Sequence, residues 1–136
     1  MQQETLVILK PAGVPYFEEM VSLLMENNLT VSDEQLLILT PEQVTTHYRK
    51  YSQKPFFPEM LNMAKNPMWP ILVEGEDAVI VVRERVLPIF RKKYAKDATD
   101  NALHASDPEE NPAEEVDRFF GLEGVVAQWR EKHPCK

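Results

Sequence analysis

The hydrophobic positions divide the chain into short β-rich runs and longer segments with helical spacing. Residues 5–9 (TLVIL) are almost entirely apolar and rich in β-branched side chains, which predicts a buried strand. Residues 29–39, rich in leucine and β-branched side chains, predict a second strand, and residues 68–74, which end before Gly75, predict a third. The short apolar segment 101–104 (NALH) is a candidate fourth strand.

Helical patterns lie between these strands. Residues 16–27 carry apolar side chains at helical spacing and predict a helix that a pair of asparagines ends. Thr40 caps the next helix, because Pro41 falls in its first turn and Gln43 at the capping-box position. A turn bracketed by prolines precedes another short helix, expected over residues 59–65.

The second half of the chain holds further helical segments. Residues 76–87 predict a helix that Pro88 ends, and the charged residues 89–100 are expected to be irregular. A later helix has two candidate starts, Asp107 and Asn111. Each precedes a proline and has a glutamate at the third helical position.

The tail beyond Gly121 carries Val125, Val126 and Trp129, which allow one or two more amphipathic turns. Strands separated by helices, with an apolar face on each, predict an α/β (α+β) sandwich in which helices cover one sheet. The length suits a single domain over residues 1–136. The pattern leaves the strand order open.

Composition narrows the class of protein. The chain is 43% hydrophobic and 27% charged, the balance of a soluble globular domain, and no apolar run approaches the roughly 20 residues that span a bilayer. The N-terminus lacks the features of a signal peptide. The single cysteine, Cys135, has no partner for an internal disulfide, so we expect a cytoplasmic protein without a membrane anchor.

The net charge of −7 argues against binding a nucleic-acid backbone through bulk charge. A small phosphate ligand would need a local basic cluster. With four glycines, the chain has neither a P-loop nor a Rossmann fingerprint. No histidine and cysteine pair has metal-ligand spacing, so we expect no metal bound by the protein itself.

The three histidines differ in their setting. His133 in the tail and His47 in the polar segment HYRKY are expected to be exposed. His104 follows an apolar pair and precedes a turn and a helix, so its imidazole can project from a rigid strand end. A neutral imidazole is a good nucleophile for a phosphoryl group, and Glu115 on the following helix is the natural orienting carboxylate. On these local grounds, a histidine without a catalytic role remains the alternative.

Five segments in order resemble the nucleoside diphosphate kinase family, and together they cover nearly the whole chain. They are TLVILKPAGV, HYRKYSQKPFFPEM, PILVEGEDAV, NALHASD and EEVDRFF. The resemblance implies a ferredoxin-like fold, with a four-stranded antiparallel sheet and helices over one face. It also implies ping-pong transfer of the γ-phosphoryl from a nucleoside triphosphate to a diphosphate through a phosphohistidine, with Mg²⁺ held mainly by the nucleotide phosphates.

The resemblance also assigns roles to individual residues. His104 matches the phosphorylated histidine, and Ser106 and Glu115 match the residues that support it. The remaining matches are nucleotide contacts: Lys10, Arg83 and Arg91 to phosphate, Tyr48 near the reacting phosphate, Phe56 and Met60 around the base, and Asn101 to the ribose. Without the resemblance, Lys10 reads as an exposed strand-end lysine, Tyr48 as a helix-face aromatic and Phe56 as a core residue.

Several positions depart from the family pattern. Ala12 stands for an aspartate, Ala105 for a glycine and Asp100 for an arginine. The loop between Arg83 and Arg91 is shortened to ERVLPIF and lacks the family's phosphate-binding threonine. We therefore expect weaker nucleotide affinity, and a homo-oligomer that is a dimer rather than a hexamer. The alternative function is a nucleotide-binding module with weak or no transferase activity, acting as a regulatory or interaction domain.

Overall fold

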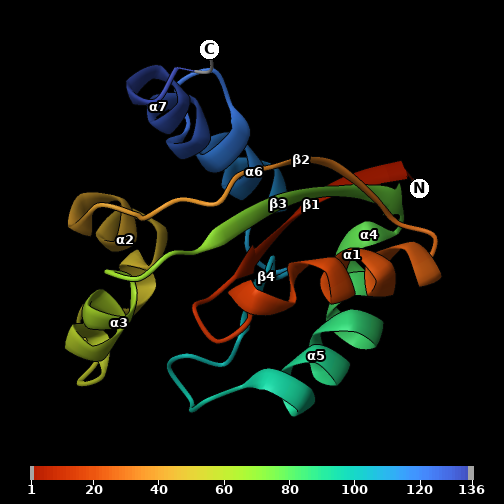
Figure 1. The fold of residues 1–136 in the computed structure, drawn as a ribbon, viewed down its shortest axis with the longest axis horizontal. Helices are drawn as coiled ribbons and strands as arrows, with labels where there is room; N and C mark the ends of the chain where they lie inside the picture. The colour runs from red at the N-terminus through yellow and green to blue at the C-terminus, as the bar shows by residue number, and fades with distance from the viewer. Residues whose placement is uncertain (1, 135–136) are drawn as a thin grey trace.

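A four-stranded antiparallel sheet with the order β2-β3-β1-β4 forms the centre of the molecule (Figure 1). The computed structural model describes residues 2–134. The strands are β1 (Gln2–Leu9), β2 (Thr30–Glu34), β3 (Trp69–Glu76) and β4 (Leu103–Ala105). Every pairing is antiparallel, and the TLVIL run of β1 is completely buried between β3 and β4. The expected sheet and its ferredoxin-like strand arrangement are confirmed.

The second strand is shorter than its apolar pattern predicts. β2 ends at Glu34 after a register shift between Val31 and Asp33, and only an isolated bridge from Leu37 to Met68 continues the pairing. Leu37 is buried in the core that Leu6 and Ile8 of β1 share with side chains of the helices. Burial there explains an apolar pattern that runs on to residue 39.

Helices cover both faces of the sheet (Figure 1). Because side chains of a strand alternate between faces, Val7 and Leu9 enter one core, and Leu6 and Ile8 enter another. The first core includes α1 (Phe17–Glu26), α4 (Ala78–Val81) and α5 (Leu87–Tyr94); the second includes α2 (Pro41–His47), α3 (Phe57–Met63), α6 (Pro112–Phe120) and α7 (Val125–Lys132). The expectation of helices over one face was therefore too narrow.

Pro88 does not end the helix that precedes it. A π-helical turn, η3 (Val82–Val86), joins α4 to α5, and the helical path runs from Ala78 to Tyr94. A proline inside a helix removes one N–H and crowds the carbonyl four residues earlier, and a wider turn relieves that crowding. The prediction of an irregular segment was wrong for residues 89–94, because Phe90 is needed in the first core.

The predicted caps decide where two other helices begin. Thr40 and Gln43 form the expected capping box at the start of α2. Asn111, not Asp107, begins α6, because its side chain accepts from the backbone N–H of Glu114. Two short 3-10 helices complete the secondary structure: η1 (Val14–Tyr16) and η2 (Arg49–Tyr51). Among residues 2–134 no helix is long and apolar enough to cross a membrane, and Cys135 lies outside the described residues.

Candidate active site

His104 occupies the middle of the three-residue strand β4, directly opposite Ile8 of β1. Its neighbours Leu103 and Ala105 enter the first core, so the imidazole points to the other face, beside α6. The His104 side chain is 18% exposed. A short strand held in a central sheet thus presents the imidazole from a rigid position.

Glu115, which the sequence predicts to orient His104, lies in the first turn of α6. Its Oε2 atom lies 3.4 Å from Nε2 of His104. Burial acts to raise the pKa of the Glu115 carboxyl, but His104 and then Ser106 outweigh burial and lower it to about 2. An ionised carboxylate beside Nε2 favours a proton on that nitrogen, which leaves the Nδ1 lone pair free.

Ser106 ties the end of β4 to β1. Its hydroxyl accepts from the backbone N–H of Leu6 at 3.3 Å and donates to the carbonyl of the same residue at 3.5 Å. The residue is 1% exposed, and it also lowers the pKa of Glu115. Ser106 therefore supports both the strand that carries His104 and the carboxylate that orients it.

Lys10 is a buried cation at the end of β1, not the exposed lysine of the alternative interpretation. It is 6% exposed, its Nζ donates to the carbonyl of Thr99 at 3.2 Å, and the ring of Tyr48 lies 5.9 Å away. Burial and then the charge of Arg91 lower its pKa to about 8, against the opposing effect of Asp100. A poorly solvated ammonium of this kind interacts strongly with a phosphate.

Arg83 and Arg91 brace β4 on either side of His104. The guanidinium of Arg83 donates to the carbonyl of Ala105 at 3.3 Å, and that of Arg91 donates twice to the carbonyl of Leu103, at 3.2 and 2.8 Å. Burial and then the charge of Arg83 lower the pKa of Arg91. Both arginines lie on the helical run that replaces the expected loop.

A cleft of about 200 Å³ opens in front of His104. Phe56 is 40% exposed and so is not a core residue, whereas Met60 is buried. The cleft brings together seven of the predicted site residues: Lys10, Tyr48, Phe56, Met60, Arg91, Asn101 and His104. Arg83 is not among the described residues that line it.

Sequence reasoning missed three residues of this cleft: Tyr51, Ala98 and Thr99. The ring of Tyr51 lies 5.7 Å from that of Phe56, so it extends the aromatic wall. Its place in the aromatic segment HYRKY was the available signal. Ala98 and Thr99 belong to a loop whose path only the folded structure gives.

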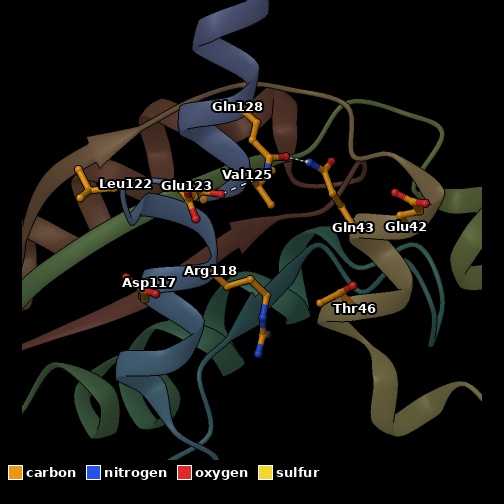
Figure 2. Close-up of a pocket in the computed structure, with 10 residues that line it drawn as sticks. Glu42, Gln43, Thr46, Asp117, Arg118, Leu122, Glu123, Val125 and Gln128 are labelled. Carbon is orange, nitrogen blue, oxygen red and sulfur yellow. Dashed lines mark hydrogen bonds between the residues drawn. The ribbon is translucent and has the colours of Figure 1, made fainter.

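His47 is buried, contrary to the expectation of an exposed side chain. It is 9% exposed, and its ring lies edge-on to that of His104, with centroids 4.9 Å apart. Nδ1 lies 3.2 Å from Nη1 of Arg118, which Figure 2 shows reaching from α6 toward α2. Burial, followed by His104, lowers the pKa of His47 well below its usual range. The end of α2 packs against α6 there, a tertiary contact that the polar sequence HYRKY does not reveal.

The loop that carries Lys10 is fixed by two of the departures from the family pattern. The carboxylate of Asp100 accepts from the backbone N–H of Ala12 at 3.1 Å through both oxygens. Gly13 passes so close to the carbonyl of Ala102 that an added Cβ would lie 2.4 Å from it. Ala102 itself adopts a positive φ of 74°. Asp100 therefore has a structural role where the family has an arginine.

A second pocket, of about 600 Å³, lies between α2 and the start of α7 (Figure 2). Gln43 donates to Gln128 across it at 3.1 Å. Of the described residues around it, none is among the predicted catalytic or nucleotide-binding residues. This larger pocket is therefore separate from the cleft in front of His104.

Known proteins resemble this chain over nearly its whole length. The sequence profile of the nucleoside diphosphate kinase family matches residues 3–125. The nucleoside diphosphate kinase of Methanosphaera stadtmanae is 30% identical over 132 residues, covering 88% of this chain and 87% of that protein. That of Hydrogenovibrio crunogenus is 31% identical over 132 residues, covering 88% and 94%.

Solved structures of nucleoside diphosphate kinases also resemble this chain. The Aquifex aeolicus nucleoside diphosphate kinase superposes with a TM-score of 0.78 at 28% identity, covering 92% of this chain and 100% of that one. The Halobacterium salinarum enzyme, solved in complex with CDP, gives a TM-score of 0.80 at 23% identity, covering 95% and 98%. The chain therefore belongs to the nucleoside diphosphate kinase family of phosphotransferases.

Proposed function

We propose that the protein transfers the γ-phosphoryl group of a nucleoside triphosphate to a nucleoside diphosphate through a phosphohistidine at His104. In the first step Nδ1 attacks the γ-phosphorus, the bond to the β–γ bridging oxygen breaks, and the diphosphate leaves. In the second step a terminal oxygen of another diphosphate attacks, and the N–P bond breaks. The contact between Nε2 and the Glu115 carboxylate carries this proposal, because it directs Nδ1 toward the substrate.

Positive charge at the cleft supports the transfer. Lys10 and Arg91 line the cleft with His104, and they offset the charge that spreads over the phosphoryl oxygens in the transition state. Among residues 2–134, those that line the cleft include no carboxylate. This donor set fits Mg²⁺ that arrives on the nucleotide phosphates and neutralises their charge, rather than Mg²⁺ held by the protein.

The remaining lining residues fit a nucleoside. Phe56 and Met60 form apolar walls for the base, and Asn101, whose Oδ1 is buried without a hydrogen-bond partner among the described residues, is placed to bind the ribose. Stacking reads no base edge, so we propose loose base specificity. We further propose that residues 1–136 act as one cytoplasmic domain that assembles as a homodimer. Its mass in solution tests the dimer, and a hexamer would contradict it.

The position of Arg83 favours a second candidate, a nucleotide-binding module with slow or no transfer. Its guanidinium bonds the carbonyl of Ala105 and lies outside the cleft lining, so Lys10 and Arg91 are the cations in direct reach of phosphate. The shortened loop ERVLPIF lacks the family's phosphate-binding threonine, which also favours this second candidate. Such a module would bind nucleotides in a regulatory or interaction role.

Labelling of the protein separates the two candidates. The purified protein is incubated with γ-labelled ATP and Mg²⁺, and GDP is then added. We expect an acid-labile label on the protein that moves to GDP, with labelling lowered by a factor of about 10⁴ or more in His104→Ala. His133→Ala, which changes an exposed histidine in the tail, is the matched control and should label normally. Binding of nucleotide without labelling would establish the module, and labelling that survives His104→Ala would contradict the role of His104.

A further inference from the structure

A third titratable side chain joins His104 and Glu115, although phosphoryl transfer assigns it no role. One donor atom from each of His47, His104 and Glu115 lies within 4.8 Å of the donor atoms of the other two. Nε2 of His47 and Oε1 of Glu115 are buried and form no hydrogen bond within the described part of the chain, while Nε2 of His104 faces Oε2 of Glu115 at 3.4 Å. Leaving these two atoms unpaired in a packed interior is unfavourable, so a ligand that satisfies them and also binds His104 would stabilise the site.

We propose that His47, His104 and Glu115 form a binding site for a divalent transition-metal ion, represented by Zn²⁺, and that this ion inhibits phosphoryl transfer. Two imidazoles and a carboxylate are a donor set that zinc takes in proteins, with a fourth position left to water. Mg²⁺ prefers oxygen ligands and retains its own waters, so the magnesium of the substrate does not compete for these nitrogens.

The spacing of the cluster is close to that of a bound ion. A tetrahedral zinc with ligand bonds of about 2.0 Å holds its donors about 3.3 Å apart. Nε2 of His104 and Oε2 of Glu115, 3.4 Å apart, already have this separation. The ring of His47 is the part that must approach, by up to roughly 1.5 Å. Since it lies at the end of α2, a side-chain rotation can supply that movement.

The cluster can be reached without passing through the nucleotide cleft. His104 lines the cleft, whereas His47 and Glu115 line a separate hollow of about 340 Å³ between α2 and α6. The three side chains therefore lie between two openings. An ion entering through the hollow reaches His104 on the Nε2 side, away from the Nδ1 atom that attacks phosphorus.

In its present position Arg118 opposes binding of a metal ion to His47. Its guanidinium faces Nδ1 of His47 at 3.2 Å, and because an arginine only donates, the neutral imidazole carries its proton on Nε2. An ion on Nε2 would move that proton to Nδ1, against the arginine donor. Arg118 would then turn toward Glu114, whose carboxylate lies 3.6 Å away. Removing Arg118 should therefore tighten metal binding, both by removing this conflict and by removing a positive charge.

Inhibition follows from the atom that the ion occupies. A cation on Nε2 of His104 draws electron density out of the ring, and it takes over the carboxylate that would stabilise a positively charged imidazole. Both effects weaken Nδ1 as a nucleophile toward phosphorus. Zinc binding should thus lower the rate of labelling at His104, with no need to block the nucleotide cleft.

Direct binding measurements test the site without reference to activity. Calorimetry with Zn²⁺, and visible absorption with Co²⁺ as a spectroscopic substitute, should show one ion per wild-type chain. His47→Asn keeps an oxygen for Arg118 but does not reach the Nε2 position, so we expect at least ~10-fold weaker binding, and similar weakening in Glu115→Gln. Arg118→Met should bind about tenfold tighter. Circular dichroism tests whether each variant folds. If His47→Asn does not fold, metal binding by Glu115→Gln and Arg118→Met tests the site.

A control excludes the tail, where His133 lies two residues from Cys135. His133→Asn should bind Zn²⁺ as the wild type does. The proposal is overturned if the wild type binds no ion, if His47→Asn and Glu115→Gln bind as tightly as the wild type, or if His133→Asn alone abolishes binding.

A labelling experiment tests inhibition. The protein is labelled in a large excess of Mg²⁺–ATP, with or without one equivalent of Zn²⁺, and each variant is compared with itself. We expect zinc to slow labelling of the wild type several-fold and of His47→Asn much less. Equal slowing in both would overturn the inhibitory role. Failure to label without zinc would contradict the proposed function, whereas the binding measurements would still decide the metal site.

Discussion

The two faces of the sheet are built on different principles. The first core, beneath α1, α4 and α5, is an apolar cluster that includes Leu24, Val82 and Phe90. The second face carries Leu6 and Ile8 as well as the candidate catalytic groups. Six described residues have buried polar atoms without a hydrogen bond: Tyr48, Asn101 and His104 line the cleft, His47 and Glu115 line the hollow between α2 and α6, and Thr5 lines neither. Both faces bury an apolar core, and the second face also leaves polar groups unsatisfied where a ligand can meet them.

Truncation in the first core should have the largest effect on stability. Leu24 is completely buried there, so Leu24→Ala removes transfer energy and leaves a cavity, and we expect a loss of about 2–5 kcal/mol in the free energy of unfolding. Denaturant unfolding measures this loss. The labelling rate per folded molecule should not change. A selective loss of labelling in fully folded protein would contradict the division between the two faces.

Substitution of Lys10 should have the opposite effect to Leu24→Ala, with a large loss of activity and no loss of stability. Lys10→Met replaces a buried cation by an apolar side chain of similar length, so we expect kcat/KM to fall by a factor of about 10²–10³ while the protein becomes no less stable. Because the pKa of Lys10 is about 8, kcat/KM of the wild type should also fall as the pH rises through 8, where the ammonium loses its proton.

Lys10→Arg is the control for that pH dependence. An arginine stays protonated over the whole range, so the decline above pH 8 should disappear even if the absolute activity is lower. An unchanged pH profile in Lys10→Arg would assign the decline to another group and would remove Lys10 from the phosphate contacts.

The sequence predicted the sheet and most of the candidate site because these depend on local patterns. The run TLVIL lies within β1 and the motif NALHASD is one continuous segment around β4, and the structure brings seven residues chosen by motif into one cleft. The cap at Asn111 was one of two equivalent candidates, since Asp107 has the same sequence features, and only packing selects between them.

Features that depend on contacts between distant elements were not predictable. Pro88 is an ordinary helix terminator by sequence, yet the burial of Phe90 in the first core keeps the chain helical through a π turn. His47 looks polar and exposed until α6 packs against α2. Likewise, the cluster of His47, His104 and Glu115 draws on three separate elements, so no sequence spacing reveals it.

Removing the hydroxyl of Tyr48 should have the smallest effect on stability. Comparison with a tyrosine beside the first core then contrasts the two faces directly. The Tyr48 hydroxyl is buried without a hydrogen-bond partner among residues 2–134, and burial, together with Glu115, raises the pKa of the phenol well above its usual range. Tyr48→Phe keeps the ring against His47 and His104 but removes an unsatisfied polar atom. We therefore expect unchanged stability, or a gain of up to about 1 kcal/mol, together with weaker labelling if the hydroxyl meets the reacting phosphate.

Tyr94→Phe is the matched substitution beside the first core. The Tyr94 hydroxyl donates to the carboxylate of Glu19, so its removal should lower the stability and leave labelling intact. The two variants delete the same atom from the same type of residue, and thermal unfolding with labelling compares them directly. Opposite signs in stability would show that the cleft stores unsatisfied polar groups for its ligand. A loss of stability in Tyr48→Phe equal to that in Tyr94→Phe would mean that the Tyr48 hydroxyl is already paired in the free protein, and the contrast between the faces would fail at that residue.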